Sequence, residues 1–268
     1  MAATVWKGYL SFGLVSFPVR LFAAARPKTI HFHLLHKKDL SRVKEVWYCA
    51  KEEKRIERSE MVKGYEIDKG RSVVVNDVEL KQIEPVTAST MDVLQFVREN
   101  EVDPLYFERS YYVGAEGKLT KPYALFVHAL RDSKFHAVAK LSMHGREHVV
   151  LIRPMDDGLL LHTLFYQDEL QKGNKRGEST KVDRKELDLA KNLIKQLAAP
   201  FQPESFHDEY RANVERLIQQ KQNHETITTV ERPRKAEVID LMEALKRSLG
   251  AAKSSQAKTK TSKRRKVA

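Results

Sequence analysis

The sequence is poor in cysteine and has no long apolar run, and each absence excludes a class of protein. Its one cysteine, Cys49, cannot form an intramolecular disulfide, which excludes a disulfide-rich secreted domain and favours a reducing compartment. No apolar run reaches the ~18 residues that a membrane-spanning helix needs. The first residues also lack the charged and apolar segments of an export signal. We therefore expect a cytoplasmic protein without a membrane partner.

The motifs by which enzymes hold phosphates or activate water are also missing. Gly117-Lys118 has Tyr112 where a phosphate-binding loop needs its first glycine, and no dinucleotide-binding pattern or nucleophile elbow occurs. Asp156-Asp157 and His207-Asp208 are the only close pairs that suggest metal-dependent hydrolysis, and a turn and a polar helix face explain them as well. We expect no catalytic residue and no cofactor.

Three histidines and the cysteine raise the question of a metal site. His31 and His33 would share one face of a strand, and His36 and Cys49 follow them. A second thiolate is missing, so the set matches no familiar structural-zinc spacing. Solvated or hydrogen-bonded histidines explain the pattern better than a ligand set, and we predict no metal.

Positive charge is abundant and unevenly distributed. The 268 residues include 48 Lys and Arg against 36 Asp and Glu, which gives a net charge of +12. Seven of these basic residues, and no acid, lie in residues 251–268. Because no long basic amphipathic helix accompanies the charge, nucleic acid is favoured over acidic lipid as the partner.

The first two thirds of the sequence are typical of strands. Short apolar runs with aromatic and β-branched residues alternate with turns, and Ser16 separates the first two runs. Residues 28–71 contain many Lys and Arg residues without a helical period, which predicts an extended arm. The predicted strands are 9–15, 17–22, 72–75, 92–97, 159–165 and a hairpin of 137–143 with 148–152; an aromatic-rich segment covers 105–113, and helices are predicted at 77–82 and 123–130.

The last third is typical of helices. Asp183 and Glu186 form a capping-box pattern before a helix that ends at Pro200, and a second helix after Pro203 has Phe206 and Tyr210 on its apolar face. Residues 222–233 are a polar linker. Residues 234–250 are an amphipathic helix whose apolar positions are Val238, Leu241, Met242, Leu245 and Leu249. The tail 251–268 cannot bury enough apolar surface to order itself.

Several motifs occur together along the chain. They are Trp6-Lys7-Gly8, Ser11-Phe12-Gly13-Leu14-Val15, Pro18-Val19-Arg20-Leu21, Lys63-Gly64-Tyr65-Glu66, Lys121-Pro122-Tyr123 and Phe206-His207-Asp208-Glu209-Tyr210. This set closely resembles the Ku proteins of bacteria, which bind DNA double-strand ends, and the resemblance covers about residues 5–220. Many relatives place a second cysteine three positions after the first, where this chain has Glu52.

The resemblance implies an α+β, mainly β fold. Its core, residues 1–220, would be a Ku-type β-barrel with an extended β-strand bridge arm (about 29–75) and C-terminal helices (about 183–221), followed by a disordered basic tail. Two copies would close a homodimeric ring that DNA threads. Family members protect and bridge double-stranded DNA ends at the bacterial nucleoid and recruit an ATP-dependent DNA ligase for non-homologous end joining. The helix 234–250 resembles the recruiting segment, so its apolar positions are predicted to bind the partner.

The predicted DNA contacts are basic residues of the barrel, the arm and the tail. A ring needs Lys and Arg against the phosphates and no contact with base edges. The alternative interpretation of the arm is a solvated edge ribbon guarded by charge. The predicted residues are Arg20, Lys28, Lys37, Lys38, Arg42, Lys44, Lys51, Lys54, Arg55, Lys63, Lys69 and Arg71, with Lys253, Lys258, Lys260, Lys263, Arg264, Arg265 and Lys266 in the tail.

A second function remains compatible with the sequence. The chain could be a nucleoid-associated architectural protein that coats DNA through its basic tail, with the barrel serving only to dimerise. Such a protein would show no preference for DNA ends, which separates the two hypotheses.

Overall fold

The computed structural model describes residues 3–117, 121–171, 182–227 and 248. The second half of the linker predicted at 222–233, the amphipathic helix predicted at 234–250 except for residue 248, and the whole tail 251–268 lie outside the described residues. The chain divides into two units, Met1–Lys172 and Gly173–Ala268.

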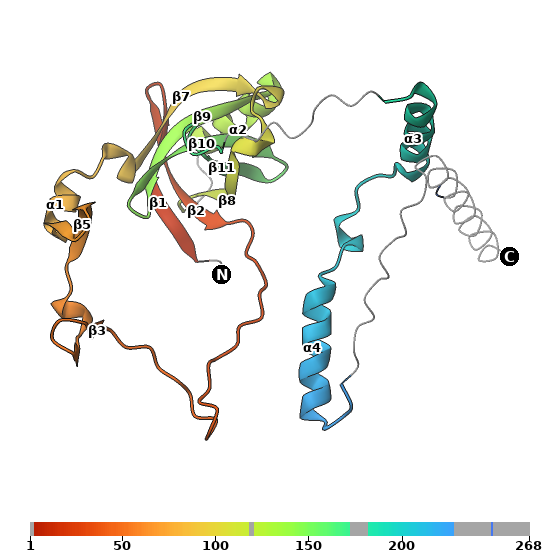
Figure 1. Ribbon diagram of the computed structural model, residues 1–268. Coiled ribbons are helices and arrows are strands. Elements are labelled where there is room, and N and C mark those ends of the chain that lie inside the picture. The colour runs from red at the N-terminus through yellow and green to blue at the C-terminus, as the bar shows by residue number, and fades with distance from the viewer. Residues whose placement is uncertain (1–2, 118–120, 172–181, 228–247, 249–268) are drawn as a thin grey trace. The chain divides into compact units, whose positions relative to one another are not determined.

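In the described part of the first unit, seven strands close into a barrel (Figure 1). They pair in the order β1-β2-β8-β11-β10-β9-β7, and each pair is antiparallel except β1 with β7, which is parallel. The strands are β1 (Thr4–Phe12), β2 (Val15–Ala23), β7 (Thr90–Arg98), β8 (Phe107–Ala115), β9 (Phe135–Met143), β10 (Arg146–Met155) and β11 (Gly158–Leu164). The mainly β barrel implied by the resemblance is confirmed.

The first hairpin turns earlier than predicted. The sequence pattern placed the break between the first two strands at Ser16, and this was wrong, because Ser16 lies inside β2 and pairs with Ser11 of β1. The turn is at Gly13 and Leu14, where Gly13 has φ +58°. Glycine adopts this left-handed conformation at little cost, so Gly13 favours a reversal of the chain at this point.

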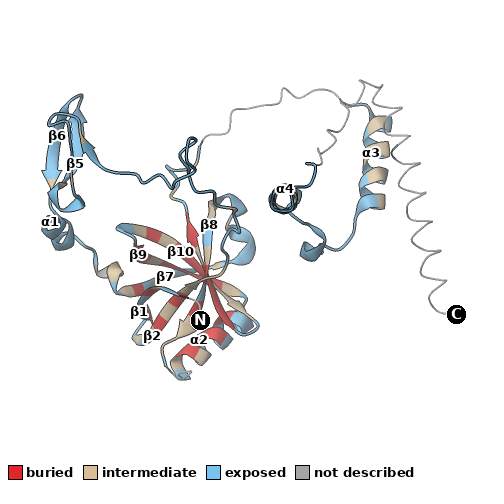
Figure 2. Ribbon diagram, turned by 90° about the horizontal axis from the view of Figure 1, so that it is seen from below, coloured by how far each residue is buried: buried red, intermediate tan, exposed pale blue. Residues whose placement is uncertain are grey.

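The main core lies inside the barrel. Alternate strand residues such as Leu10, Val19 and Leu141 point inward and are buried. Helix α2 (Lys121–Ser133) contributes its buried residues, Phe126 among them, to the same core. Figure 2 shows this buried face of α2 turned toward the strands. The core therefore combines residues of the barrel strands with residues of α2.

Outward-facing residues of the barrel form a second, smaller apolar cluster. Val138, Leu151 and Leu164 are buried on this outer face. Val102 and Tyr106 pack against them from the segment that contains η3 (Glu99–Glu101) and η4 (Pro104–Tyr106). The predicted aromatic-rich segment 105–113 thus begins in this turn rather than in β8.

Two histidines on the outer face lie next to this cluster. His162 contacts the Nε of Arg153 (3.1 Å) and the Oγ of Ser110 (2.9 Å), whereas the Nδ1 of His136 is buried without a hydrogen-bond partner among the described residues. Burial, reinforced by the Arg153 guanidinium, lowers the pKa of both imidazoles. The carboxylate of Glu99 acts in the opposite direction on His136 but is outweighed. Both histidines are therefore neutral near pH 7.

We expect the barrel to lose stability as the pH falls below about 6.5. The unfolded chain then takes up protons that the folded His136 and His162 resist, so the free energy of unfolding decreases until the pH passes their folded pKa. Each histidine contributes at most about 1.4 kcal/mol per pH unit. Urea denaturation between pH 7.5 and 5 measures this slope. The double variant His136→Gln/His162→Gln should flatten it, and an unchanged slope would contradict the assignment.

The chain leaves the barrel after β2 and rejoins it at β7 (Figure 1). Within this arm, β3 (Tyr48–Cys49) pairs with β4 (Lys54–Arg55), and β5 (Lys63–Asp68) pairs with β6 (Arg71–Val75). The arm also contains η1 (Arg58–Glu60), and α1 (Asp77–Gln82) and η2 (Val86–Ala88) lead back to the barrel. The predicted helix 77–82 is confirmed, and nearly all arm residues are exposed.

The described residues of the second unit form α3 (Arg184–Leu197), η5 (Pro203–Ser205) and α4 (Glu209–Gln222). The prediction that Phe206 lies in the second helix was wrong. The carboxylate of Asp208 accepts a hydrogen bond from the backbone N–H of Arg211 (3.0 Å) and caps α4 there, so Phe206 stays outside and stacks on Phe201 (5.7 Å between ring centroids).

Candidate nucleic-acid interface

Most basic side chains of the barrel are already paired. Lys7 and Arg20 both contact the Oε1 of Glu116, at 2.6 and 2.8 Å. Lys140 pairs with Glu147 at 3.0 Å in the same way. The hydrogen bond from Arg20 lowers the pKa of Glu116, so this carboxylate stays ionised and keeps both cations at neutral pH. Arg20, one of the predicted DNA contacts, is thus engaged within the barrel.

The basic side chains of the arm are mostly free. Among the residues that the structure describes, eight of the predicted DNA contacts in the arm form neither an ion pair nor a side-chain hydrogen bond with a described residue, and all eight are exposed. A cation with no carboxylate partner keeps its full charge available for a polyanion. These residues are Lys28, Lys37, Lys38, Lys44, Lys51, Arg55, Lys69 and Arg71.

The remaining three predicted contacts in the arm have local partners. Lys54 pairs with Glu52 (2.7 Å), Lys63 pairs with Asp77 (2.7 Å), and Arg42 contacts the Nδ1 of His33 (3.0 Å). All three contacts are solvent-exposed. Exposed ion pairs contribute about 1 kcal/mol or less, so a phosphate can replace the carboxylate partner of Lys54 or Lys63 with little loss.

The β5–β6 hairpin presents an apolar face to solvent. Tyr65 lies directly opposite Val73, Ile67 lies two residues further along β5, and the three side chains are exposed. Figure 2 shows this hairpin exposed along its length. An isolated two-stranded hairpin is only marginally stable in water, and apolar surface of this kind is typical of an interface.

The histidines and the cysteine of the arm do not form a ligand set. His31 contacts Thr29 (3.0 Å), His33 contacts Arg42, and His36 contacts Asp39 (3.0 Å). Over residues 3–117, 121–171 and 182–227, no three His, Cys, Asp or Glu side chains come together as metal ligands. Glu52, three positions after Cys49, is paired with Lys54. These residues do not fit a structural zinc ion.

A cleft at the root of the arm contains two cations that are not among the predicted DNA contacts. Arg26 and Arg109 line it together with His144 of the β9–β10 turn, and its volume is about 780 Å³. Arg26 stands directly before Pro27, at the start of the arm, and this position was the signal that could have pointed to it.

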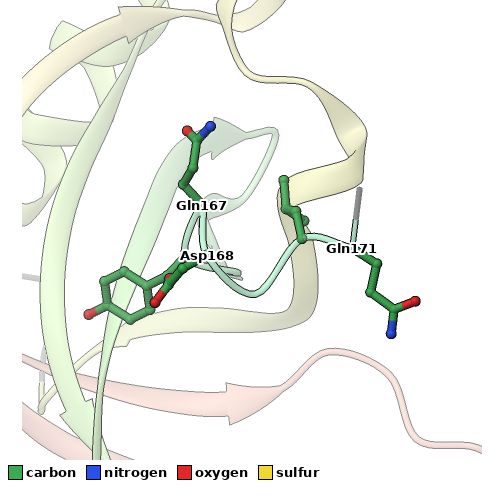
Figure 3. A pocket seen from close by; sticks show the side chains of 5 residues that line it. Gln167, Asp168 and Gln171 are labelled. Atoms are coloured by element: carbon green, nitrogen blue, oxygen red, sulfur yellow. The ribbon is translucent and has the colours of Figure 1, made fainter. Parts of the chain in front are cut away.

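A second hollow, of about 620 Å³, lies in the segment after β11 (Figure 3). Tyr166, Gln167, Asp168, Leu170 and Gln171 line it, and the side chains of Gln167 and Gln171 point away from each other. No basic residue lines the hollow, so it is unsuited to a phosphate.

The predicted partner-binding residues of 234–250 and all predicted contacts of the tail lie outside the described residues. In the part of the chain that is described, no helix is long and apolar enough to span a membrane.

Comparison with known proteins identifies the family. The family model described as the Ku70/Ku80 beta-barrel domain matches residues 11–189. The chain belongs to the Ku family. It is 65% identical over 260 residues to the "Non-homologous end joining protein Ku" of Solibacter usitatus, covering 96% of this chain and 97% of that protein.

More distant Ku proteins match over nearly the same length. Identity is 47% over 254 residues with that of Koribacter versatilis, covering 94% of this chain and 88% of the relative. It is 35% over 252 residues with that of Bacillus subtilis, covering 92% and 81%. Both carry the name "Non-homologous end joining protein Ku".

Proposed function

We propose that this chain binds the ends of double-stranded DNA during non-homologous end joining, as a homodimeric ring that the DNA threads. The observation that carries the proposal is the contrast between the paired cations of the barrel and the unpaired cations of the arm. The names of the relatives support the same pathway.

Free arm cations suit binding that ignores sequence. Duplex DNA carries one negative charge per ~1.7 Å of axis, so a collar of Lys and Arg releases counterions without reading base edges. Because breaks occur at any sequence, an end-joining protein must bind DNA without sequence preference. Selectivity for an end then comes from topology, because a closed ring can be entered only from a free terminus.

Dimerisation supplies what one arm lacks. A single arm cannot enclose a duplex, and a two-fold axis is the commonest way for one kind of chain to form a closed assembly. The exposed face formed by Tyr65, Ile67 and Val73 is apolar surface that a second copy would cover.

The C-terminal residues complete the proposal. The apolar positions of 234–250 bind an ATP-dependent DNA ligase, and the tail 251–268 binds DNA by charge alone. The protein itself performs no catalysis, and it acts at the bacterial nucleoid.

Linear, hairpin-capped and circular duplexes of equal length test the ring. We expect tight binding to linear DNA and at least tenfold weaker binding to relaxed circles and to duplexes capped at both ends, measured by gel shift. Equal binding to all three would contradict the ring and favour the architectural protein.

A chain ending at Gly250, run beside the full chain, separates the tail from the ring. The truncated chain should bind more weakly, with a smaller salt dependence, and should keep its preference for linear DNA. If that preference disappears, the proposal that the ring selects DNA ends and the tail adds only electrostatic affinity is wrong.

A further inference from the structure

The end of the arm that returns to the barrel is fixed to β1 by two hydrogen bonds. The indole Nε1 of Trp6 donates to the backbone carbonyl of Ala88 (3.0 Å). The backbone N–H of Tyr9 donates to the carbonyl of Ser89 (2.9 Å). Trp6 is buried, so its hydrogen bond is shielded from competition by water.

A third hydrogen bond joins the same segment to β10. The hydroxyl of Thr87 donates to the Oε1 of Glu147 (3.0 Å), and the Nζ of Lys140 donates to the other oxygen of this carboxylate (3.0 Å). The hydrogen bond from Lys140 lowers the pKa of Glu147, so the carboxylate stays ionised at neutral pH. We call the three bonds to Thr87, Ala88 and Ser89 the anchor.

Gly8 allows the anchor to form. A Cβ at this buried position would collide with the backbone carbonyl of Ser89 and with the indole ring of Trp6. Glycine within a strand is typical of a place where another segment of backbone approaches closely. The motif Trp6-Lys7-Gly8 therefore supplies one donor of the anchor and the space that the anchor needs.

The anchor lies outside the strand pairs that close the barrel. β1 and β7 pair from Tyr9 with Thr90 to Ser11 with Asp92. The carbonyls and the hydroxyl of the anchor belong to residues 87–89, which precede β7. The anchor thus holds the end of the arm, in addition to the closure of the sheet.

The arm is otherwise unattached to the barrel. Among the residues and side chains that the structure describes, no hydrogen bond or ion pair joins residues 25–86 to the barrel strands. At the outgoing end, the last such bond runs from the N–H of Ala24 to the carbonyl of Ser110 (3.0 Å). The direction in which the arm leaves the barrel is therefore set at its two roots.

Short elements connect the anchor to free cations of the arm (Figure 1). Pro85, whose ring fixes its own φ, stands directly before η2. α1 precedes it, and the first residue of this helix, Asp77, pairs with Lys63 of β5 (2.7 Å). The hairpin of β5 and β6 carries Lys69 and Arg71, which form no ion pair with a described residue.

We propose that Trp6, Gly8 and Thr87 are positioning residues for DNA binding, which hold the free cations of the arm in place before the duplex arrives. An arm released at this root samples more conformations, and DNA then has to order it on binding. The phosphates contacted stay the same while the affinity falls. This inference rests on the proposed DNA binding and assigns residues that prepare the chain for it.

The double variant Trp6→Phe/Thr87→Val tests the anchor without changing any charge. It removes two of the three donors and keeps an aromatic ring and a β-branched side chain in their places. We expect the full-length variant to bind linear duplex DNA about tenfold more weakly at about 0.15 M salt, since two hydrogen bonds of ordinary strength have this effect. The slope of log K against log salt should stay at its wild-type value, because no phosphate contact is removed.

The variant Gly8→Ala disturbs the same segment by steric collision and should lower the affinity in the same way. The control Ile152→Val truncates a fully buried core residue at the other end of β10 from Glu147. This truncation destabilises the barrel and leaves the anchor intact, so affinity and slope should equal those of the wild type. Fluorescence anisotropy over a salt series compares all the variants, after circular dichroism has shown that each is folded.

Hydrogen exchange at the amide of Tyr9 reports on the anchor without DNA, because this N–H donates to Ser89. Exchange should accelerate in Gly8→Ala and in the double variant, and stay near the wild-type rate in Ile152→Val. Unchanged exchange in the anchor variants would show that the three bonds do not act as one unit, which overturns the inference.

The remaining outcomes separate the inference from the function on which it rests. Accelerated exchange at Tyr9 with wild-type DNA affinity would mean that the anchor only stabilises the barrel, and DNA binding would stand without it. A shallower salt slope in the double variant would also overturn the inference, because phosphate contacts would then have been lost. Failure of the wild-type protein to bind linear duplex DNA would instead contradict the proposed function.

Discussion

A variant with five arm cations replaced by glutamine should bind linear duplex DNA at least a hundredfold more weakly at about 0.15 M salt. The five are Lys37, Lys38, Lys44, Lys51 and Arg55, which are exposed and form no ion pair with a described residue. Each phosphate contact contributes about 0.9 to the slope of log K against log salt. A wild-type slope near −5, for about six neutralised phosphates, should therefore become much shallower.

The matched control removes the same charge from the second unit. Arg184, Lys185, Lys191, Lys195 and Lys221 are exposed on α3 and α4 and form no ion pair with the described residues. Replacing these five by glutamine changes the net charge equally and should lower the affinity by less than about tenfold. Fluorescence anisotropy over a salt series measures both variants. Equal losses would mean that net charge, and not the arm, governs binding.

The variant Phe126→Ala should lower the free energy of unfolding of the barrel by about 3–5 kcal/mol. Phe126 is 1% exposed, and its ring lies 4.7 Å from that of Phe12 and 6.0 Å from that of Phe17, measured between centroids. The truncation removes the contacts that hold α2 against the first hairpin and leaves a cavity that the rigid strands cannot fill.

The neighbouring residue provides the control. Leu125 is on the same helix and is 58% exposed, so Leu125→Ala should change the free energy of unfolding by no more than about 0.5 kcal/mol. Urea denaturation followed by circular dichroism compares the two variants. Similar destabilisation by both would show that α2 does not pack as described.

Local signals explain which elements could be predicted. Asn76 and Glu79 form the capping box of α1, and the sequence-based range 77–82 matches the helix. The alternation in 137–143 and 148–152 likewise predicted the hairpin of β9 and β10, joined at His144-Gly145. In both cases the residues that determine the element lie close to one another in the sequence.

The errors have equally local causes. Ser16 interrupts an apolar run, which predicts a break there, although Gly13 has the backbone freedom that the turn requires. Phe206 fits the helical period of α4, but Asp208 caps the helix two residues later. Periodicity shows which residues share a face and does not show where an element begins.

The amino-acid sequence alone determined the family, the mainly β class and the excess of positive charge in the arm and the tail, because motifs, alternation and composition are properties of neighbouring residues. Only the tertiary structure decided which cations remain free. Glu116 reaches Lys7 and Arg20, and Glu147 reaches Lys140, because the strands pair across the barrel. Neutralisation depends on distances of a few ångströms in space, and closure of the barrel sets those distances.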